Sequence, residues 1–224
     1  MPDRLAGKRV VVTDAAEFMG PDIVSLFREE GAEVIADTSD LCAPGRCVSL
    51  IANAGHVDVL MVNLASGNNN FSVLDTGDET LDAMFARMVR PLHQLTRAVL
   101  PQMIERRHGK IVVVGSAHGM RGHPNRSVYS AARMAQHGYV RSVGVEVAPH
   151  GVNVLATGQT FVENPSYFSP DYQATEEFRQ RLRGLPAGRL STGREAAMFL
   201  LALAGPETDW RFGQVFAYAG GWVV

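Results

Sequence analysis

Short runs of β-branched residues alternate along the chain with longer stretches of helical periodicity. Strands are predicted at six places: 9–13 (RVVVT), 32–37 (AEVIAD), 58–63 (DVLMVN), 110–116 (KIVVVGS), 152–157 (VNVLAT) and 214–219 (QVFAYA). Helices are predicted between them, at 19–30, about 79–106, 127–147, about 174–183 and about 193–203. Residues 38–56 show no clear period, and no element is assigned there.

The predicted strands are apolar nearly throughout, which is typical of a parallel sheet covered on both faces. Right-handed crossovers through the intervening helices then give a doubly wound α/β fold. The sequence has no internal repeat and no long linker, so we expect residues 1–224 to form a single domain. Pro91 lies inside the long helical region and predicts a kink or a break there.

Composition and charge narrow the class of function. Hydrophobic residues make up 46% of the chain and charged residues 20%, as in an ordinary soluble protein. The formal net charge of −2 disfavours a nucleic-acid surface. The sequence has no apolar run long enough for a membrane helix, and residues 1–10 do not resemble a signal peptide. We therefore expect a soluble, cytoplasmic protein. Cys42 and Cys47 lack companion ligands, which predicts reduced surface thiols and no metal site.

The first predicted strand leads into a turn, residues 13–20, where a dinucleotide-binding fold has its glycines. Only Gly20 remains of that pattern. Asp14 and Glu17 bring negative charge, and Phe18 brings bulk, to the place where a pyrophosphate would lie. The sequence therefore argues against a bound nicotinamide dinucleotide. Asp37 then has no ribose to bind, and we expect it to be a solvated residue at a strand end.

Three polar residues follow the fourth predicted strand, where active sites gather in open α/β sheets. Ser116 ends the strand, and Tyr129 and Arg133 share one face of the next helix at spacing i, i+4. A fixed guanidinium lowers the pKa of a nearby phenol, so Tyr129 can serve as a general base while Ser116 holds a substrate oxygen. Taken singly, such a pair is usually a surface contact, and Ser116 also suits a helix or turn cap. The combination is the stronger signal, because all three residues lie at the expected end of the sheet.

The chain resembles the short-chain dehydrogenase/reductase superfamily over nearly its whole length, which implies a Rossmann-like sheet. The likeness is carried by the spacing of Ser116, Tyr129 and the basic residue four positions on, and by the segments RLAGKRVVVT, DVLMVNLA, LTRAVLPQMIERRHGKIVVVGSA and GQVFAYAGGW. Arg133 stands where the superfamily has its catalytic lysine. Near Met88 the superfamily has a proton-relaying asparagine, and this chain does not.

Arg133, the altered turn with Phe18, and the segment NPSYFSPD at 164–171 together resemble the halohydrin dehalogenases, in particular their shorter B-type members. The resemblance implies that Tyr129 takes the proton of a vicinal haloalcohol, Ser116 binds its oxygen, and Arg133 lowers the phenol pKa. Halide leaves, an epoxide forms, and the reverse reaction opens epoxides with halide, azide, cyanide or nitrite. No cofactor or metal takes part, and the family forms homotetramers.

The resemblance also implies a halide pocket in the space where relatives hold nicotinamide. Its matching residues are Phe18, Gly158, Gln159, Thr160 and Phe161, although Gln159 and Thr160 differ from the residues of some relatives. Plain core packing is the alternative for Phe18, and loop packing is the alternative for Phe161, Tyr167 and Phe168. Trp222 covers either a pocket or a subunit contact, and His118 is expected in a solvated loop.

Two other functions compete with a dehalogenase. A divergent NAD(P)-dependent oxidoreductase would need its cofactor to sit over Glu17 and Phe18. A non-catalytic subunit of the same fold would not need Tyr129 at all. Chloride release without added cofactor favours the first interpretation, nucleotide binding favours the second, and indifference to Tyr129→Phe favours the third.

Overall fold

The computed structural model describes residues 3–67 and 70–224, and within these ranges the strands form a single parallel sheet. The strand order is β2-β1-β3-β4-β5-β6, and every neighbouring pair is parallel. The strands are β1 (Arg9–Val12), β2 (Glu33–Ala36), β3 (Val59–Val62), β4 (Gly109–Val113), β5 (Val152–Gln159) and β6 (Val215–Tyr218). The predicted doubly wound, single-domain α/β fold is confirmed.

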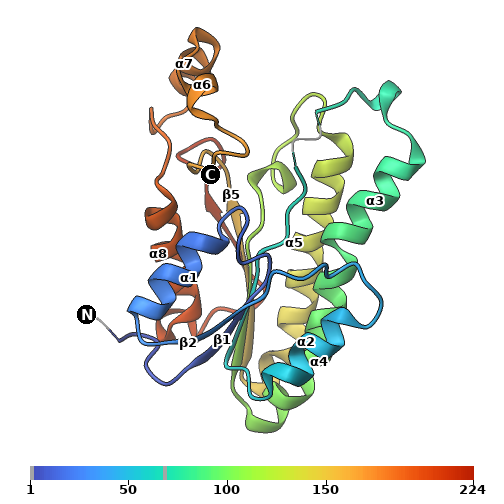
Figure 1. Cartoon of the computed structure of the whole chain (residues 1–224), viewed down its shortest axis with the longest axis vertical. Coiled ribbons are helices and arrows are strands. Elements are labelled where there is room, and N and C mark those ends of the chain that lie inside the picture. The colour runs from blue at the N-terminus through green and yellow to red at the C-terminus, as the bar shows by residue number, and fades with distance from the viewer. Residues whose placement is uncertain (1–2, 68–69) are drawn as a thin grey trace.

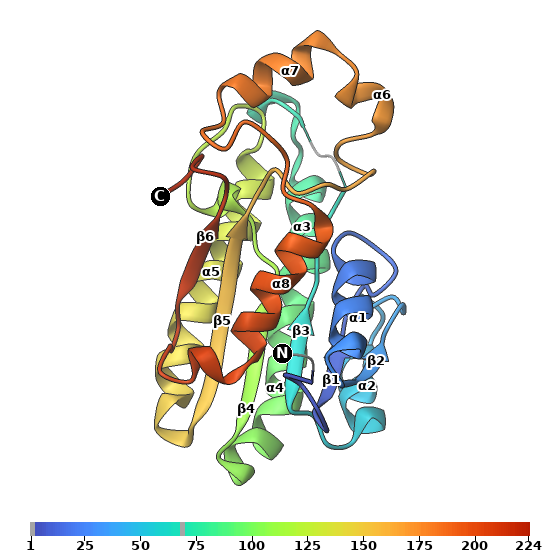
Figure 2. The same cartoon turned by 90° about the vertical axis from the view of Figure 1, so that its left-hand side faces the viewer.

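Helices cover both faces of the sheet (Figure 1). One face carries α1 (Gly20–Glu29) and α8 (Gly193–Ala204), and the other carries α2 (Arg46–Ala54), α4 (Arg90–Arg106) and α5 (Ser127–Val147). The helix α3 (Asp78–Met88) packs on α4 and α5. Above the carboxyl ends of the strands lie α6 (Pro170–Gln173) and α7 (Glu176–Arg183), as Figure 2 shows. Short 3-10 turns occupy Val73–Asp75, Ala117–Gly119, Ala148–His150 and Pro206–Thr208.

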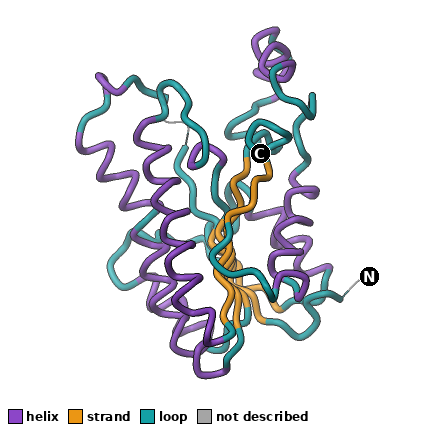
Figure 3. Tube along the Cα trace, turned by 180° about the vertical axis from the view of Figure 1, so that it is seen from behind, coloured by secondary structure: helices purple, strands orange, loops and turns teal. Residues whose placement is uncertain are grey.

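Two hydrophobic cores form because successive strand residues point to opposite faces. Val10 of β1 packs toward α1 and α8, whereas Val11 packs toward α2, α4 and α5. All four residues of β3 are buried. The near-continuous apolar runs of the sequence therefore reflect a sheet without a solvent face, as expected for parallel strands. The trace in Figure 3 shows this sheet between its two helical layers.

The break predicted at Pro91 is confirmed, because the region 79–106 is two helices, α3 and α4, separated at Val89. Pro91 lies in the first turn of α4, where its missing N–H is tolerated and where it blocks continuation from α3. The unassigned region 38–56 contains α2, whose buried face includes Cys47. The prediction that both cysteines are surface thiols is therefore wrong for Cys47, although Cys42 is exposed.

The strand order reverses between β1 and β3, since the crossovers from these strands run in opposite directions across the sheet. In open α/β sheets such a switch point leaves a crevice beyond the carboxyl ends of the strands, where ligands bind. The loops after β1, β3, β4 and β5 all reach this edge, and α6 and α7 lie above it. The fold thus brings the predicted site residues to one place.

Candidate active site

In the turn after β1, two residues other than glycine adopt a backbone conformation that favours glycine. Asp14 and Phe18 have φ values of 44° and 51°, in the left-handed region. At the retained Gly20, a Cβ would lie 2.4 Å from the carbonyl oxygen of Asp14, so only glycine fits. Asn63, which follows β3, donates from Nδ2 to the carbonyl oxygens of Asp14 and Glu17, each at 3.0 Å. Contacts with neighbouring residues therefore stabilise the backbone conformation of the turn.

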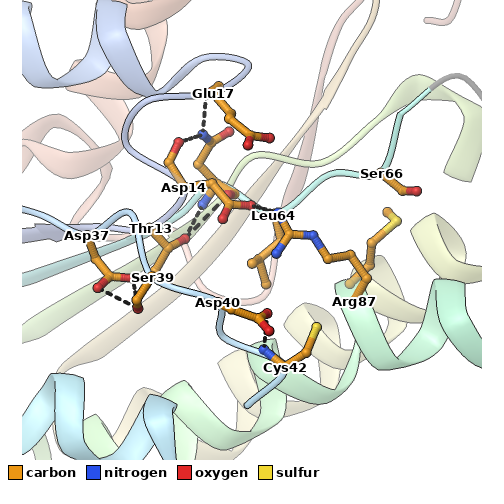
Figure 4. A network of polar contacts seen from close by, with 12 residues as sticks. Thr13, Asp14, Glu17, Asp37, Ser39, Asp40, Cys42, Leu64, Ser66 and Arg87 are labelled. Atoms are coloured by element: carbon orange, nitrogen blue, oxygen red, sulfur yellow. Dashed lines mark hydrogen bonds and ion pairs between the residues drawn. The ribbon is translucent and has the colours of Figure 1, made fainter.

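Asp14 is buried and pairs with Arg87 of α3 at 2.8 Å (Figure 4). The pKa of Asp14 is raised from its ordinary 3.8 to about 6. Burial is the main cause, the charges of Glu17 and Asp37 act in the same direction, and the attraction of Arg87 acts in the opposite one. Negative charge therefore collects beside the turn at neutral pH.

Asp37 is not the solvated residue that the sequence predicts. It is 5% exposed, and its carboxylate accepts hydrogen bonds from Ser39 at 2.8 and 2.9 Å (Figure 4). Arg46 of α2 pairs with the same carboxylate at 3.1 Å. The prediction failed because α2, which brings Arg46 to this strand end, was not assigned from the sequence.

These residues do not fit a dinucleotide. A pyrophosphate at the turn would lie near the negative charge of Glu17 and of Asp14, although Asp14 is already paired with Arg87. The side chain of Phe18 adds a ring to the turn and lines the cavity, with its ring centroid 5.8 Å from that of Tyr167. A ribose would find the Asp37 carboxylate already bonded to Ser39 and Arg46.

Tyr129 and Arg133 meet on the buried face of α5, as their spacing predicts. The Nε atom of Arg133 donates to the Tyr129 hydroxyl at 3.0 Å. Its Nη1 atom donates to the carbonyl oxygens of Leu64 and Val114 at 2.9 and 3.0 Å, and to Gln136 Oε1 at 3.0 Å. Arg133 is only 3% exposed, so its charge is fixed by the loops that follow β3 and β4.

This arrangement makes Tyr129 more acidic than an ordinary tyrosine. Burial alone would raise its pKa, because it disfavours the phenolate. The charge of Arg133, hydrogen bonds from Ser116 and Arg133, and the charge of Arg126 together overcome that effect and lower the pKa below its usual value of 10.0. The site can therefore hold a phenolate and exchange a proton through it.

Ser116 lies just beyond β4, with His118 beside it. The Ser116 hydroxyl lies 3.3 Å from His118 Nδ1 and also accepts from the His118 backbone N–H. The prediction of a solvated His118 is wrong: its ring is 5.7 Å from that of Tyr129 and 5.2 Å from that of Trp222. Burial, followed by the charges of Arg126, His123, Arg181 and Arg133, lowers the pKa of His118 to about 3, so the imidazole is neutral.

A cavity of about 470 Å³ contains these groups. Of the residues predicted to form a halide pocket, Phe18, Gln159, Thr160 and Phe161 line it. Gly158 is not among the lining residues; a Cβ there would lie 2.2 Å from the sulfur of Met120, so this glycine admits a packing contact.

The aromatic residues of the loop after β5 both line the cavity and hold the loop. Phe161 stacks on Phe168 at a ring distance of 6.2 Å and meets Trp222 edge-on at 6.4 Å. The Tyr167 hydroxyl donates to the carbonyl oxygen of Ser66 at 2.9 Å. Burial and the neighbouring Tyr129 raise the pKa of Tyr167, so it stays a neutral phenol. Half-buried Trp222 packs against its own chain's site wall.

Three residues of the site, Gln136, Arg126 and Arg181, are not predicted from the sequence. Gln136 links Arg133 to the carbonyl oxygen of Met88, to which its Nε2 donates at 2.8 Å. Met88 itself is fully buried, so the position near the superfamily's relay asparagine holds an apolar side chain. Arg126 and Arg181 also line the cavity. The spacing i, i+3 relates Gln136 to Arg133, but nothing local in the sequence marks the other two arginines.

Residues 3–67 and 70–224 contain no group of three or more His, Cys, Asp or Glu side chains placed to hold a metal ion. Among the same residues, no helix combines the length and hydrophobicity that crossing a bilayer demands.

Comparisons with known proteins place this geometry in a family. The chain is 29% identical over 249 aligned residues to the 3-oxoacyl-[acyl-carrier-protein] reductase FabG of Thermotoga maritima, covering 99% of this chain and all of the reductase. A solved structure described as a dehalogenation enzyme matches with a TM-score of 0.91 and 27% identity, covering 98% and 99% of the two chains.

A second solved structure is halohydrin dehalogenase (HheC) bound to ethyl (2S)-oxiran-2-ylacetate. It matches with a TM-score of 0.88 and 23% identity, covering 97% of this chain and 98% of that one, and at this identity it supports the fold alone. The sequence pattern of the short chain dehydrogenase family matches residues 5–169. With the sheet order and the Ser116, Tyr129 and Arg133 arrangement in place, we conclude that the chain belongs to the short-chain dehydrogenase family.

Proposed function

We propose that the protein is a halohydrin dehalogenase that acts without a nicotinamide cofactor. It converts vicinal haloalcohols to epoxides with release of halide and a proton, and it opens epoxides with small anions in the reverse direction. One observation carries the proposal: around a single cavity, Tyr129 is bonded to a buried Arg133, and Phe18 occupies the turn where a pyrophosphate would lie. The 27% identity to a dehalogenation enzyme adds support.

In the forward reaction, the Tyr129 phenolate accepts the hydroxyl proton of the haloalcohol. The oxygen then bonds to the neighbouring carbon as the carbon–halogen bond breaks, and the bonding pair leaves with the halide. Tyr129 returns the proton to solvent, so the products are an epoxide, a halide and a proton. Ser116 orients the oxygen by a hydrogen bond, and Arg133 acts through Tyr129 as a positioning residue. Since the attack is intramolecular, correct positioning supplies much of the rate.

The reverse reaction uses the same groups. Neutral Tyr129 donates its proton to the ring oxygen while halide, azide, cyanide or nitrite attacks carbon. We place the anion between Phe18 and the segment Gln159–Thr160–Phe161, whose aromatic edges and polar groups face the cavity. Gly158 has no part in this pocket.

Halide release tests the proposal directly. We expect 1,3-dichloro-2-propanol to yield chloride and an equal amount of acid when the protein is incubated with it in the absence of nucleotides. A chloride electrode and a pH-stat measure the two products. Tyr129→Phe is the control for uncatalysed ring closure. Absence of chloride above that control, for this compound and its dibromo analogue, would refute the proposal.

A second candidate is an NAD(P)-dependent reductase, which the full-length likeness to FabG favours. It requires NADH or NADPH to bind despite Phe18 and the carboxylates of the first turn. Titration with either nucleotide, followed by energy transfer from tryptophan to the reduced nicotinamide, separates the candidates. We expect no saturable transfer. Saturable transfer together with hydride transfer to a ketone would favour the reductase.

We further propose that the protein assembles as a homotetramer. The outer face of α5 exposes Met134 and Val145, at 50% and 70%, and such apolar positions on a helix support packing against another copy. Light scattering coupled to size-exclusion chromatography gives the mass. A monomer at micromolar concentration would contradict the assembly without affecting the proposed chemistry.

A further inference from the structure

The cavity has more positive charge than the proposed reaction requires. Besides Arg133, the guanidinium groups of Arg126 and Arg181 line it. Glu177 is the one carboxylate among the described residues of the lining. A neutral haloalcohol needs neither additional arginine, so their presence calls for another explanation.

Arg181 differs from its neighbours on α7. Arg179 and Arg183 are exposed and pair with Glu176 at 2.9 and 3.3 Å. Arg181 is half-buried, and within residues 3–67 and 70–224 no carboxylate pairs with it at 4.0 Å or less. Its ion-pairing capacity therefore faces the cavity, whereas the other two arginines use theirs on the surface.

Aromatic rings hold Arg181 in place. Its guanidinium carbon lies 5.4 Å from the ring centroid of Phe161 and 5.8 Å from that of Phe168. Its Nη1 atom lies 3.5 Å from the Tyr172 hydroxyl, which in turn donates to Glu177 at 3.3 Å. A guanidinium stacked on aromatic faces keeps its planar donors available for a carboxylate or phosphate, with little loss of side-chain freedom on binding.

Arg126, which precedes α5, adds to the positive electrostatic potential in the cavity. Its guanidinium carbon lies 5.7 Å from the ring centroid of Tyr129. The charges of Arg126, Arg181 and Arg133 all act on the His118 ring, which shows that three cations converge on one region. Glu177 is exposed and opposes only part of this charge.

The size of the cavity also exceeds the needs of a three-carbon substrate. Its volume of about 470 Å³ lies within the roughly 300–1,000 Å³ of pockets that enclose drug-sized ligands. A longer substrate can therefore reach from Tyr129 toward α7. Net positive charge in a partly desolvated pocket favours an anionic group at that end.

We propose that the substrate is a haloalcohol or epoxide that carries a carboxylate, and that Arg181, assisted by Arg126, binds this carboxylate. The inference rests on the proposed function for the reacting end of the substrate. Arg181 is then the specificity-determining residue, because it distinguishes an acid from its ester without contacting the reacting atoms.

The test compares 4-chloro-3-hydroxybutanoate with its ethyl ester, whose ring closure gives the kind of epoxide ester bound in the HheC structure. The measured quantity is the acid-to-ester ratio of kcat/KM. We expect the wild type to prefer the acid, and Arg181→Met to reduce the ratio by about tenfold to a hundredfold, as loss of a charge-assisted hydrogen bond predicts. Arg181→Lys, which keeps the charge, recovers part of the preference.

Arg183→Met is the matched control, because it removes an arginine from the same helix that faces solvent and pairs with Glu176. The acid-to-ester ratio stays at its wild-type value in this control. An equal preference for acid and ester in the wild type, or the same fall in Arg181→Met and Arg183→Met, would overturn the proposal. A free anion site for the nucleophile would instead appear as weaker chloride inhibition in Arg181→Met with an unchanged ratio.

Binding without turnover separates this inference from the proposed function. Calorimetric titration of the Tyr129→Phe protein with oxiran-2-ylacetate and with its ethyl ester reports anion recognition alone. Tighter binding of the acid that depends on Arg181 supports the carboxylate site even where halide release is absent, which would refute only the dehalogenase. Halide release with no such binding difference would refute only the carboxylate site.

Discussion

The wall formed by β4 and α5 and the turn between β1 and α1 border the same cavity but are stabilised in different ways. In the wall, Arg133 donates from Nε to the phenol of Tyr129, and its Nη1 atom donates to two backbone carbonyls and to Gln136. In the turn, a glycine-like path is held by the amide of Asn63 and by the ion pair of Asp14 with Arg87. In both regions the sheet and its neighbours fix the path of the backbone, while the side chains on that backbone decide the chemistry.

Among the variants considered, Tyr129→Phe should reduce the activity most. The phenol ring and its packing remain, but the group that exchanges the proton is lost. We expect kcat for halide release to fall by roughly 10²–10⁴-fold, the usual contribution of general acid–base catalysis. Circular dichroism and the melting temperature check that the fold persists. Turnover near the wild-type rate would show that Tyr129 is not the base.

Asp14→Asn tests the turn through the pH dependence of stability. The pKa of Asp14 in the folded protein is about 6, above its ordinary 3.8. The folded state therefore holds the proton more tightly, and this stabilisation is complete below about pH 4 and is lost as the pH rises through 6. Asparagine tolerates the left-handed backbone and cannot ionise.

We expect Asp14→Asn and the wild type to have similar stability near pH 4. At pH 8 the variant should be more stable by about 3 kcal/mol, from 1.36 kcal/mol per pKa unit. Urea denaturation at several pH values gives the free energies of unfolding. Parallel pH profiles for the two proteins would contradict a buried carboxylate with a raised pKa.

Arg133→Lys tests whether the buried guanidinium lowers the pKa of Tyr129. Lysine keeps a charge but cannot reproduce the planar bonds to Tyr129 and to both backbone carbonyls. The pKa of Tyr129 then rises, so the rising limb of the pH–rate profile for ring closure moves to higher pH. At pH 7 we expect kcat/KM to fall by about tenfold, from loss of charge-assisted hydrogen bonds. Arg133→Gln should move the limb further, and unshifted profiles would remove the electrostatic role.

Substitutions of Phe18 test the backbone conformation of the turn, and we expect them to have the smallest effect. Its φ of 51° favours glycine over any residue with a Cβ. We expect Phe18→Gly to be more stable than Phe18→Ala by about 1 kcal/mol, the usual cost of a left-handed L-residue. Thermal denaturation of the two variants measures the difference. Equal stabilities would show that the turn relaxes to another conformation once the ring is removed.

The sequence was enough to predict the sheet and the catalytic wall. The apolar, β-branched runs of the strands and the i, i+4 spacing of Tyr129 and Arg133 are local signals, so they can be interpreted without knowledge of long-range contacts. The helix α2 was missed because Gly45, in the left-handed region, precedes it in place of a usual capping residue. Its apolar spacing at Cys47, Leu50, Ile51 and Ala54 was nevertheless present in the sequence. Without α2, the sequence could not predict that Arg46 pairs with Asp37.

The remainder of the site depends on long-range contacts that no local pattern encodes. His118 is half-buried, and one of the rings that cover it is that of Trp222, about a hundred residues later in the chain. Arg181 faces the cavity while Arg179 and Arg183 on the same short helix face solvent, and the sequence offers no rule that separates them. Gly158 was placed in the halide pocket by resemblance, but the side chain of Met120 occupies the space beside it.

The contacts that Asn63 and Arg87 make with the first turn have a consequence for ligand binding. A phosphate-binding loop gains much of its order from the phosphate, whereas this turn is already bonded within the protein. The N–H groups of Thr13, Ala15, Glu17 and Gly20 also donate to backbone carbonyls. We therefore expect these four amides to exchange slowly with solvent deuterium in the free protein and to change little when a substrate binds. The conformational entropy of ordering this side of the crevice is thus lost during folding, so ligand binding does not incur that cost again.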